Sequence, residues 1–338
     1  MLSFACGHCG RLVFFENTVC LNCSTELGFL PERLELVALD RPPGNALHRC
    51  ANATVAACNW LVAQPGRLCR SCELTRQRPN DRDVPGLAAF AEAESAKRRV
   101  VMQLLDLRLP GVTPDRLRFD LLSSEHQPVT TGHADGVITI DLAESDDARR
   151  EQRRTELGEP YRTMLGHLRH ELGHYFQPLL VTGEEDWETC RTLFGDERAD
   201  YGSALERHYD NGPPAGWRST HVSAYATMHP WEDWAETFGH YLHIRDTLET
   251  AAEYGVTVSG PRAVERDRSL KATPQPDAGD RGFDEVLENW LPLTYALNAV
   301  NRSMGRDDLY PFTLAAPVLE KLRFVHERVQ AATAALAS

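Results

Sequence analysis

The sequence lacks any apolar stretch of membrane-spanning length, and it lacks an export signal at its start. No segment offers eighteen consecutive apolar residues, so we expect no membrane-spanning helix. The first residues read MLSFACGHCG, without the basic region and the apolar core of a secretory signal. These two absences predict a cytoplasmic protein that does not act in a membrane.

Positive charge is also scarce. The 338 residues include 36 Lys+Arg and 49 Asp+Glu, which gives a net charge of −13. Residues 1–83 hold nine arginines and eight acidic residues, so the net negative charge lies in the rest of the chain. Because a surface this acidic repels a phosphate backbone, we expect no nucleic-acid partner. The sequence also has no repeat of solenoid length and no low-complexity tract.

Cysteine, in contrast, is plentiful and unevenly placed. Eight of the nine cysteines precede residue 73 and form two groups, C-x2-C-x10-C-x2-C and C-x7-C-x10-C-x2-C. A C-x2-C turn directs two thiolates at one ion, so each group predicts one structural zinc ion. The predicted ligands are Cys6, Cys9, Cys20 and Cys23 in the first group, and Cys50, Cys58, Cys69 and Cys72 in the second.

Two alternatives stay open for these cysteines. Disulfides would need an oxidising compartment, which the predicted location does not supply. In the second group Cys50 and Cys58 form no C-x2-C turn, and His48 could replace one of them as a ligand. The ninth cysteine, Cys190, is predicted to be a small buried hydrophobic residue.

Turn-forming residues divide the chain. Segments 39–45 and 76–86 are predicted to be linkers, which leaves a zinc ribbon at 1–38, a second zinc module at 45–80 and a body at 85–338. Hydrophobic periodicity predicts strands at 117–122 and 136–142, a long loop at 258–282, and helices at 87–107, 160–176, 185–209, 230–249, 283–304 and 314–336. Strands followed by helices indicate an α+β body.

The stretch HLRHELGHYF carries the strongest chemical signal of the body. Pro160 suits the start of a helix, Pro178 is expected just past its end, and leucines and tyrosines between them form an apolar stripe. His170 and His174 are one turn apart, so both can bind one zinc ion, and Glu171 can take a proton from water beside it. His167 lies one turn earlier, where it could line the cleft, support a ligand, or itself bind the metal with His170.

A catalytic zinc needs a third protein ligand. Glu232 and Glu236 are four residues apart on a helix that Pro230 can begin, and four aromatic residues accompany them. We predict that Glu232 binds zinc and that Glu236 orients a ligand histidine. Asp196 and Asp200 are rival third ligands.

These motifs resemble the bacterial "putative zinc-binding metallopeptidase" family, in which a zinc ribbon precedes a gluzincin-like HExxH domain. The matching segments include CNWLV, LCRSC, TGHADGVITI, HELGH, HVSAYATMHPWEDWAETF and DLYPF. The resemblance implies a gluzincin-type body with a small antiparallel sheet and helices. The segment that contains HELGH, here called the metal helix, also looks like the zinc site of lethal factor, a gluzincin toxin.

That second resemblance implies more about individual residues. Tyr225, seven residues before Glu232, would donate to the oxyanion, and the strand at 136–142 would be the edge strand beside the cleft. His133 and His240 would lie near that cleft or serve a structural role.

The leading hypothesis is a peptidase with one catalytic and two structural zinc ions, in which Glu171 is the general base and a peptide or protein is the substrate. The zinc modules could also contact a protein partner. Two alternatives are a binding or regulatory module with a weakly active or inactive body, and a zinc hydrolase of a non-peptide amide.

Overall fold

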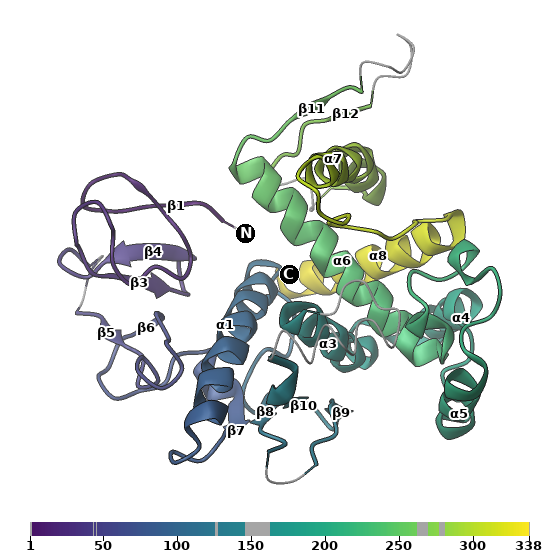
Figure 1. Cartoon of the computed structure of the whole chain (residues 1–338), viewed down its shortest axis with the longest axis horizontal. Coiled ribbons are helices and arrows are strands. Elements are labelled where there is room, and N and C mark those ends of the chain that lie inside the picture. Colours follow the sequence, from purple (N-terminus) through teal and green to yellow (C-terminus); the bar gives the residue numbers. More distant parts are fainter. Residues whose placement is uncertain are drawn as a thin grey trace. The chain divides into compact units, whose positions relative to one another are not determined.

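The computed structural model describes residues 2–42, 44, 46–125, 128–145, 163–261, 270–276 and 281–337 (Figure 1). The described residues form seven α-helices and several small sheets, so the fold is α+β as predicted. By its internal contacts the chain divides into two compact units. One comprises Leu2–Arg153 with Thr163–Glu171, and the other comprises Leu172–Ser338, apart from the undescribed residues. None of the helices in the described part combines the length and the apolar character that a membrane span needs.

The cysteine-rich segment consists of short antiparallel hairpins. β1 (Phe4–Ala5) pairs with β2 (Leu12–Val13), β3 (Leu27–Leu30) with β4 (Glu35–Ala38), and β5 (His48–Arg49) with β6 (Leu61–Val62). Phe29 lies between Phe15 and Trp60, with ring centroids 4.8 and 5.0 Å apart. All three rings are fully buried. These aromatic contacts give the small cysteine-rich segment a hydrophobic core that joins its two halves.

The segment predicted as a linker at 76–86 is irregular at 78–83 and lies in regular elements at both ends. The 3₁₀ turn Cys72–Leu74 leads directly into β7 (Thr75–Gln77), and α1 (Val84–Asp106) follows. β7 lies parallel to β8 (Arg118–Leu122) and adds a strand to the sheet of the body. Arg76 and Gln77 both donate hydrogen bonds to the buried Asp120, which explains why so polar a segment can pair as a strand.

The sheet has the order β7-β8-β10-β9 and is mixed, whereas an antiparallel sheet was expected. β10 (Val137–Asp141) is parallel to β8 and antiparallel to β9 (Gly132–Ala134). The strand at 136–142 is therefore internal, and the expectation that it is the edge strand is wrong. The reason is the turn at Asp135–Gly136, where both residues have positive φ (50° and 77°), which folds β9 back along β10 as an outer strand.

The metal helix α3 (Met164–Leu180) extends beyond its predicted end. Pro160 lies outside the described residues. Pro178 lies inside the last turn, and the helical hydrogen bonding continues from Val181 N to Gln177 O at 2.9 Å. A proline removes one backbone donor, and here the burial of Phe176, Leu180 and Val181 holds the last turn in place.

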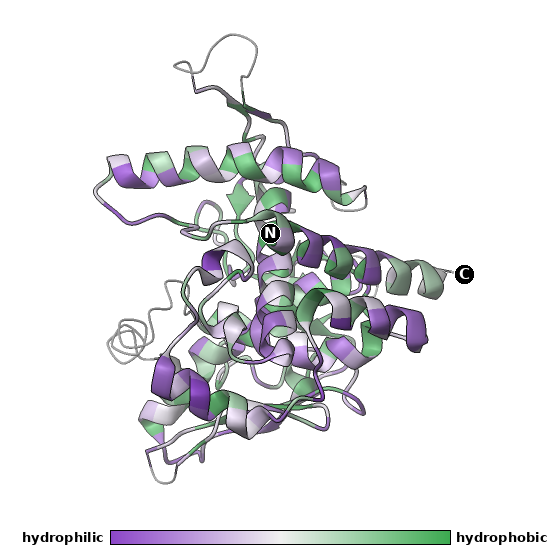
Figure 2. Cartoon of the chain, turned by 90° about the vertical axis from the view of Figure 1, so that its right-hand side faces the viewer, coloured by the Kyte–Doolittle hydropathy of each residue, from purple (hydrophilic) through white to green (hydrophobic). Residues whose placement is uncertain are grey.

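The second unit is otherwise a group of helices. Its members are α4 (Gly183–Phe194), α5 (Tyr201–Asn211), α6 (Pro230–Glu253), α7 (Phe283–Ser303) and α8 (Ala316–Ala337). The helix predicted at 185–209 is two helices, because Gly195 with φ +99° ends α4 and Asp200 caps α5. In the predicted loop 258–282, β11 (Val258–Ser259) pairs with β12 (Lys271–Ala272). α7, drawn horizontally near the top of Figure 2, alternates hydrophobic and hydrophilic patches, as a half-buried helix should.

Candidate metal centres and active site

The metal helix has a buried apolar face. Leu168, Leu172 and Phe176 follow at spacings of four residues, and each is fully buried. This burial fixes the rotation of α3. As a result His170 and His174, one turn apart, both direct ring nitrogens toward the same point.

Gly173 lets α6 approach this helix closely. A Cβ atom at Gly173 would lie 2.7 Å from Ala235 Cα, so only glycine permits this backbone contact. The Trp234 indole N–H donates to Gly173 O at 2.9 Å, and Phe176 stacks on Phe238 with centroids 5.5 Å apart. Backbone-to-backbone packing at this point brings Glu232, one turn earlier on α6, next to His174.

His170, His174 and Glu232 form a three-ligand cluster. One nitrogen or oxygen atom of each lies within 4.8 Å of the others, and His174 Nε2 is 3.3 Å from Glu232 Oε2. Zinc–nitrogen and zinc–oxygen bonds of about 2.0–2.2 Å in a tetrahedron separate two ligand atoms by about 3.4 Å. The donor set and its spacing therefore fit a zinc ion with one position left for water or substrate.

The start of α6 holds Glu232 in place. His229 caps the helix by accepting a hydrogen bond from Trp231 N at 3.1 Å, and its second ring nitrogen contacts Ala199 O at 3.0 Å. The Trp231 ring packs on His174, with centroids 5.0 Å apart. Asp233 forms a buried ion pair with Lys321 of α8 at 2.6 Å, which anchors the first turn of α6 from its other side.

One tyrosine contacts the Glu232 carboxylate, and a second tyrosine contacts the first. The Tyr201 hydroxyl donates to Glu232 Oε1 at 3.0 Å. Tyr225 is hydrogen-bonded to Tyr201, and because the single Tyr201 proton goes to the carboxylate, Tyr225 is the donor. Burial raises the pKa of Tyr225, and the nearby Glu232 carboxylate raises it further, so the phenol stays protonated. Sequence reasoning selected Tyr225 and missed Tyr201, for which the only signal was its place beside Asp200.

The rival ligands Asp196 and Asp200 do not join this cluster. Asp196 is half exposed and forms an ion pair with Arg198 at 2.7 Å. Asp200 caps α5 by accepting a hydrogen bond from Ser203 N at 2.7 Å. Among the described residues the three-ligand cluster contains Glu232 and neither aspartate.

The remaining predicted residues occupy different settings. His167 Nε2 lies 3.2 Å from Glu171 Oε1, so it contacts the predicted base. His133 Nε2 accepts a hydrogen bond from Gly136 N at the β9–β10 turn. His240 is buried, with Nδ1 2.8 Å from the Tyr310 hydroxyl and its ring against Phe312. Glu236 is half-buried one turn beyond Glu232.

The cysteines gather in the two predicted groups. Sulfur atoms are 3.7 Å apart in the pair Cys6–Cys23 and 3.6 Å apart in Cys58–Cys69, and none of the nine cysteines forms a disulfide. Zinc–sulfur bonds of about 2.3 Å in a tetrahedron separate the sulfurs by about 3.8 Å. Each group therefore fits one zinc ion, and the second cluster consists of Cys50, Cys58, Cys69 and Cys72 without His48. Cys190 is buried, which raises the pKa of its thiol to about 12.

Comparison with known proteins agrees with this geometry. Residues 86–328 match the family described as "Putative zinc-binding metallo-peptidase", and residues 3–83 match a zinc-ribbon domain. "Uncharacterized protein Rv2568c" of Mycobacterium tuberculosis is 52% identical over 334 residues, which cover 96% of this chain and 94% of that protein. "Uncharacterized protein Mb2598c" of Mycobacterium bovis has the same identity and coverage. No solved structure matches the chain significantly.

Proposed function

The chain belongs to the family described as "Putative zinc-binding metallo-peptidase", and on this premise we propose that it is a zinc-dependent peptidase of the gluzincin type. The observation that carries the proposal is the convergence of His170, His174 and Glu232 beside Glu171 of the HELGH sequence. Two imidazoles and one carboxylate with an open fourth position are the ligand set of a catalytic zinc rather than a structural one.

The residues of the site divide the chemistry among them. Zinc, when bound, polarises the scissile carbonyl and makes water a better nucleophile at neutral pH. Glu171 takes the proton from the attacking water and passes it to the leaving amine nitrogen. His167, 3.2 Å from Glu171 Oε1, orients that carboxylate. Tyr225 turns its hydroxyl from Tyr201 to the substrate and donates a hydrogen bond to the developing oxyanion, and Glu236 orients a ligand histidine.

A peptide substrate is favoured over another amide by the family match alone. We propose three zinc ions per chain, one in this site and one in each four-cysteine cluster. The presence of Glu171 in HELGH argues against an inactive body, because a purely structural zinc site does not require a general base.

The variant Glu171→Gln tests the proposal. It should keep the zinc content of the wild type and lose hydrolysis of a peptide library, because a carboxamide in place of the Glu171 carboxylate cannot accept the proton from water. Glu188→Gln, an equally conservative change at an exposed position on α4, is the matched control and should cleave normally. Turnover by Glu171→Gln near the wild-type rate would refute the mechanism. Absence of cleavage by the wild type, with full zinc occupancy, would refute a general peptidase activity.

A further inference from the structure

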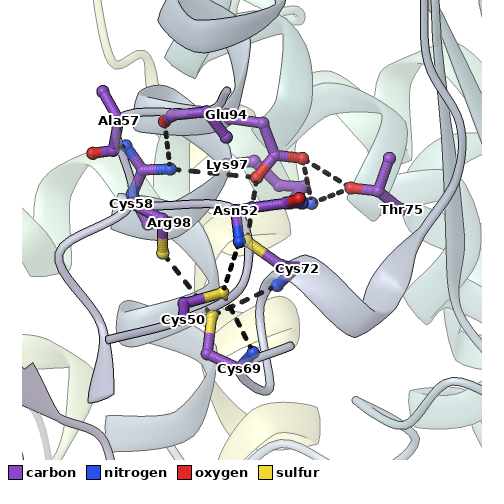
Figure 3. Close-up of polar contacts among 11 residues, drawn as sticks. Cys50, Asn52, Ala57, Cys58, Cys69, Cys72, Thr75, Glu94, Lys97 and Arg98 are labelled. Carbon is purple, nitrogen blue, oxygen red and sulfur yellow. Dashed lines mark hydrogen bonds and ion pairs between the residues drawn. The ribbon is translucent and has the colours of Figure 1, made fainter. Parts of the chain in front are cut away.

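The second four-cysteine cluster is surrounded by charged side chains of α1. Cys50, Cys58, Cys69 and Cys72 are all at most 2% exposed. Glu94, Lys97 and Arg98 lie beside them, and they are 0%, 0% and 4% exposed (Figure 3). Three buried charges within two turns of one helix are unusual, because a charge without a partner is strongly disfavoured in a protein interior.

A bound zinc ion explains the excess of positive charge. Four thiolates around one Zn²⁺ carry a net charge of about −2. Glu94 Oε2 is 3.8 Å from Cys72 Sγ and 3.9 Å from Arg98 Nη1, while Glu94 Oε1 is 2.5 Å from Lys97 Nζ. The two cations therefore offset both the carboxylate and part of the charge of the zinc-thiolate cluster.

Arg98 also binds the backbone just before Cys58, one of the predicted zinc ligands. Its guanidinium donates to Ala56 O at 3.0 Å and to Ala57 O at 3.2 Å. Ala57, which precedes Cys58, has a φ of +46°, a conformation that alanine adopts only when its surroundings impose it. On the other side, Thr75 donates to Glu94 just after Cys72. The loop of the second cluster is thus tied to α1 at two places.

The same helix contacts the metal helix further along. Gln103 Oε1 accepts hydrogen bonds from Arg169 Nη2 at 3.1 Å and from Arg169 Nε at 3.3 Å. Both side chains are buried, and Arg169 immediately precedes His170 and Glu171. All of these contacts lie within one compact unit.

We propose that the zinc of the second cluster positions the metal helix α3 through α1, with Arg98 and the Gln103–Arg169 pair as the connecting contacts. The proposal rests on the proposed function, since α3 then carries two catalytic zinc ligands. The second cluster lies within the segment that matches a zinc-ribbon domain, and in this respect it also acts on the peptidase body. The first cluster lies one step further from α3, because it meets α1 through a half-exposed ion pair of Glu16 with Arg99 and meets the second cluster's segment through Phe29 and Trp60.

A matched pair of variants in the full chain tests this. Cys58→Ser and Cys20→Ser should each lose one zinc by elemental analysis. Competition with a chromophoric chelator then measures the zinc affinity of the His170–His174–Glu232 site. The phase of the competition curve that belongs to this site is the one that is absent from the curve of Glu232→Ala. We expect Cys58→Ser to weaken that affinity about tenfold or more, and Cys20→Ser to change it less than about twofold. Loss of one zinc in Cys58→Ser with wild-type affinity at the catalytic site overturns the proposal.

A second pair covers the case in which Cys58→Ser does not fold. Gln103→Leu removes the acceptor of Arg169 and should weaken zinc binding at the catalytic site about tenfold, with both cysteine clusters filled. Gln103→Glu keeps an acceptor and should restore wild-type affinity. Wild-type affinity in Gln103→Leu, or equal losses in both variants, overturns the positioning role. Because the experiment measures zinc binding, its result does not depend on whether the wild type cleaves peptides.

Discussion

The Tyr201 hydroxyl donates to Glu232 Oε1 at 3.0 Å, while the other oxygen of the same carboxylate lies 3.3 Å from His174 Nε2. One oxygen is thus occupied by a phenol and the other faces the ligand cluster. This arrangement favours binding of a metal through a single oxygen, because rotation of the carboxylate would break the tyrosine hydrogen bond.

Tyr201→Phe should weaken zinc binding at the catalytic site by about 10–100-fold, as the loss of a group that orients a ligand usually does. The cost in folding stability should be about 1 kcal/mol, since one hydrogen bond is removed and the ring stays. Zinc competition and thermal melting measure both quantities. Tyr209→Phe, at an exposed position of the same helix, is the control and should change neither. An unchanged zinc affinity in Tyr201→Phe would remove this tyrosine from the metal site.

Tyr225→Phe separates a catalytic hydroxyl from a structural one. An oxyanion donor acts in the transition state, so kcat should fall about 10²–10³-fold. KM should barely change, and zinc content should hold. If Tyr225 serves only to hold Tyr201, the variant should instead lose zinc affinity with kcat intact at saturating zinc. Steady-state kinetics and elemental analysis on this one variant distinguish the two outcomes.

Gly173→Ala should destabilise the protein. The new methyl group would lie 2.7 Å from Ala235 Cα, so α3 and α6 must move apart, at a cost of about 1–3 kcal/mol. Zinc affinity should fall as well, because the same contact aligns Glu232 with His174. Gly202→Ala is the control: its Cβ would meet only Asp200 Oδ1 at 3.7 Å, and the helix should gain up to about 1 kcal/mol. Equal melting temperatures for the two variants would contradict the close contact.

Glu232→Ala should sharply lower the zinc occupancy of the catalytic site, because one of three protein ligands is removed. Asp196→Ala should leave occupancy unchanged, and Asp200→Ala should cost only the helix cap, about 1 kcal/mol of stability. Elemental analysis after dialysis measures occupancy. Tight zinc binding by Glu232→Ala, combined with zinc loss in an aspartate variant, would show that the third ligand is misassigned.

Chelation should remove the three zinc ions in order. The proposed catalytic site has three protein ligands and would leave one position open, so a mild chelator should extract one zinc per chain before any unfolding. The two four-cysteine ions should resist longer, and their removal should coincide with loss of structure. Zinc release followed together with circular dichroism tests this order. A total near one zinc per chain would contradict both cysteine sites.

Some parts of this protein were predictable because they depend on local spacing. The two histidines of HELGH are one turn apart, so their imidazoles lie on the same side of any α-helix. A C-x2-C turn likewise brings two thiolates close together, whatever surrounds it. Pro230 before two acids four residues apart likewise indicated the helix that carries Glu232. These patterns are determined within a few residues, where backbone geometry alone sets the distances.

Other features depended on contacts between distant segments. β7 overlaps the start of the linker predicted at 76–86, and its Arg76 pairs with Asp120 of β8, 44 residues away. The strand at 136–142 is internal because a turn with two positive φ angles folds β9 beside it. Neither partner can be read from the composition of the segment itself.

The sequence by itself determined the candidate metal ligands: which histidines share a helix face, which glutamate stands between them, and which cysteines form groups. The tertiary structure decided what surrounds the metals. Tertiary packing brings Tyr201 to Glu232, 31 residues away, and places Gly173 against Ala235. It also places Lys97 and Arg98 of α1 beside the cysteines of the second cluster. Ligand spacing follows from the period of one helix or the turn of one knuckle, whereas the partners that orient those ligands come from packing between elements, which no local pattern encodes.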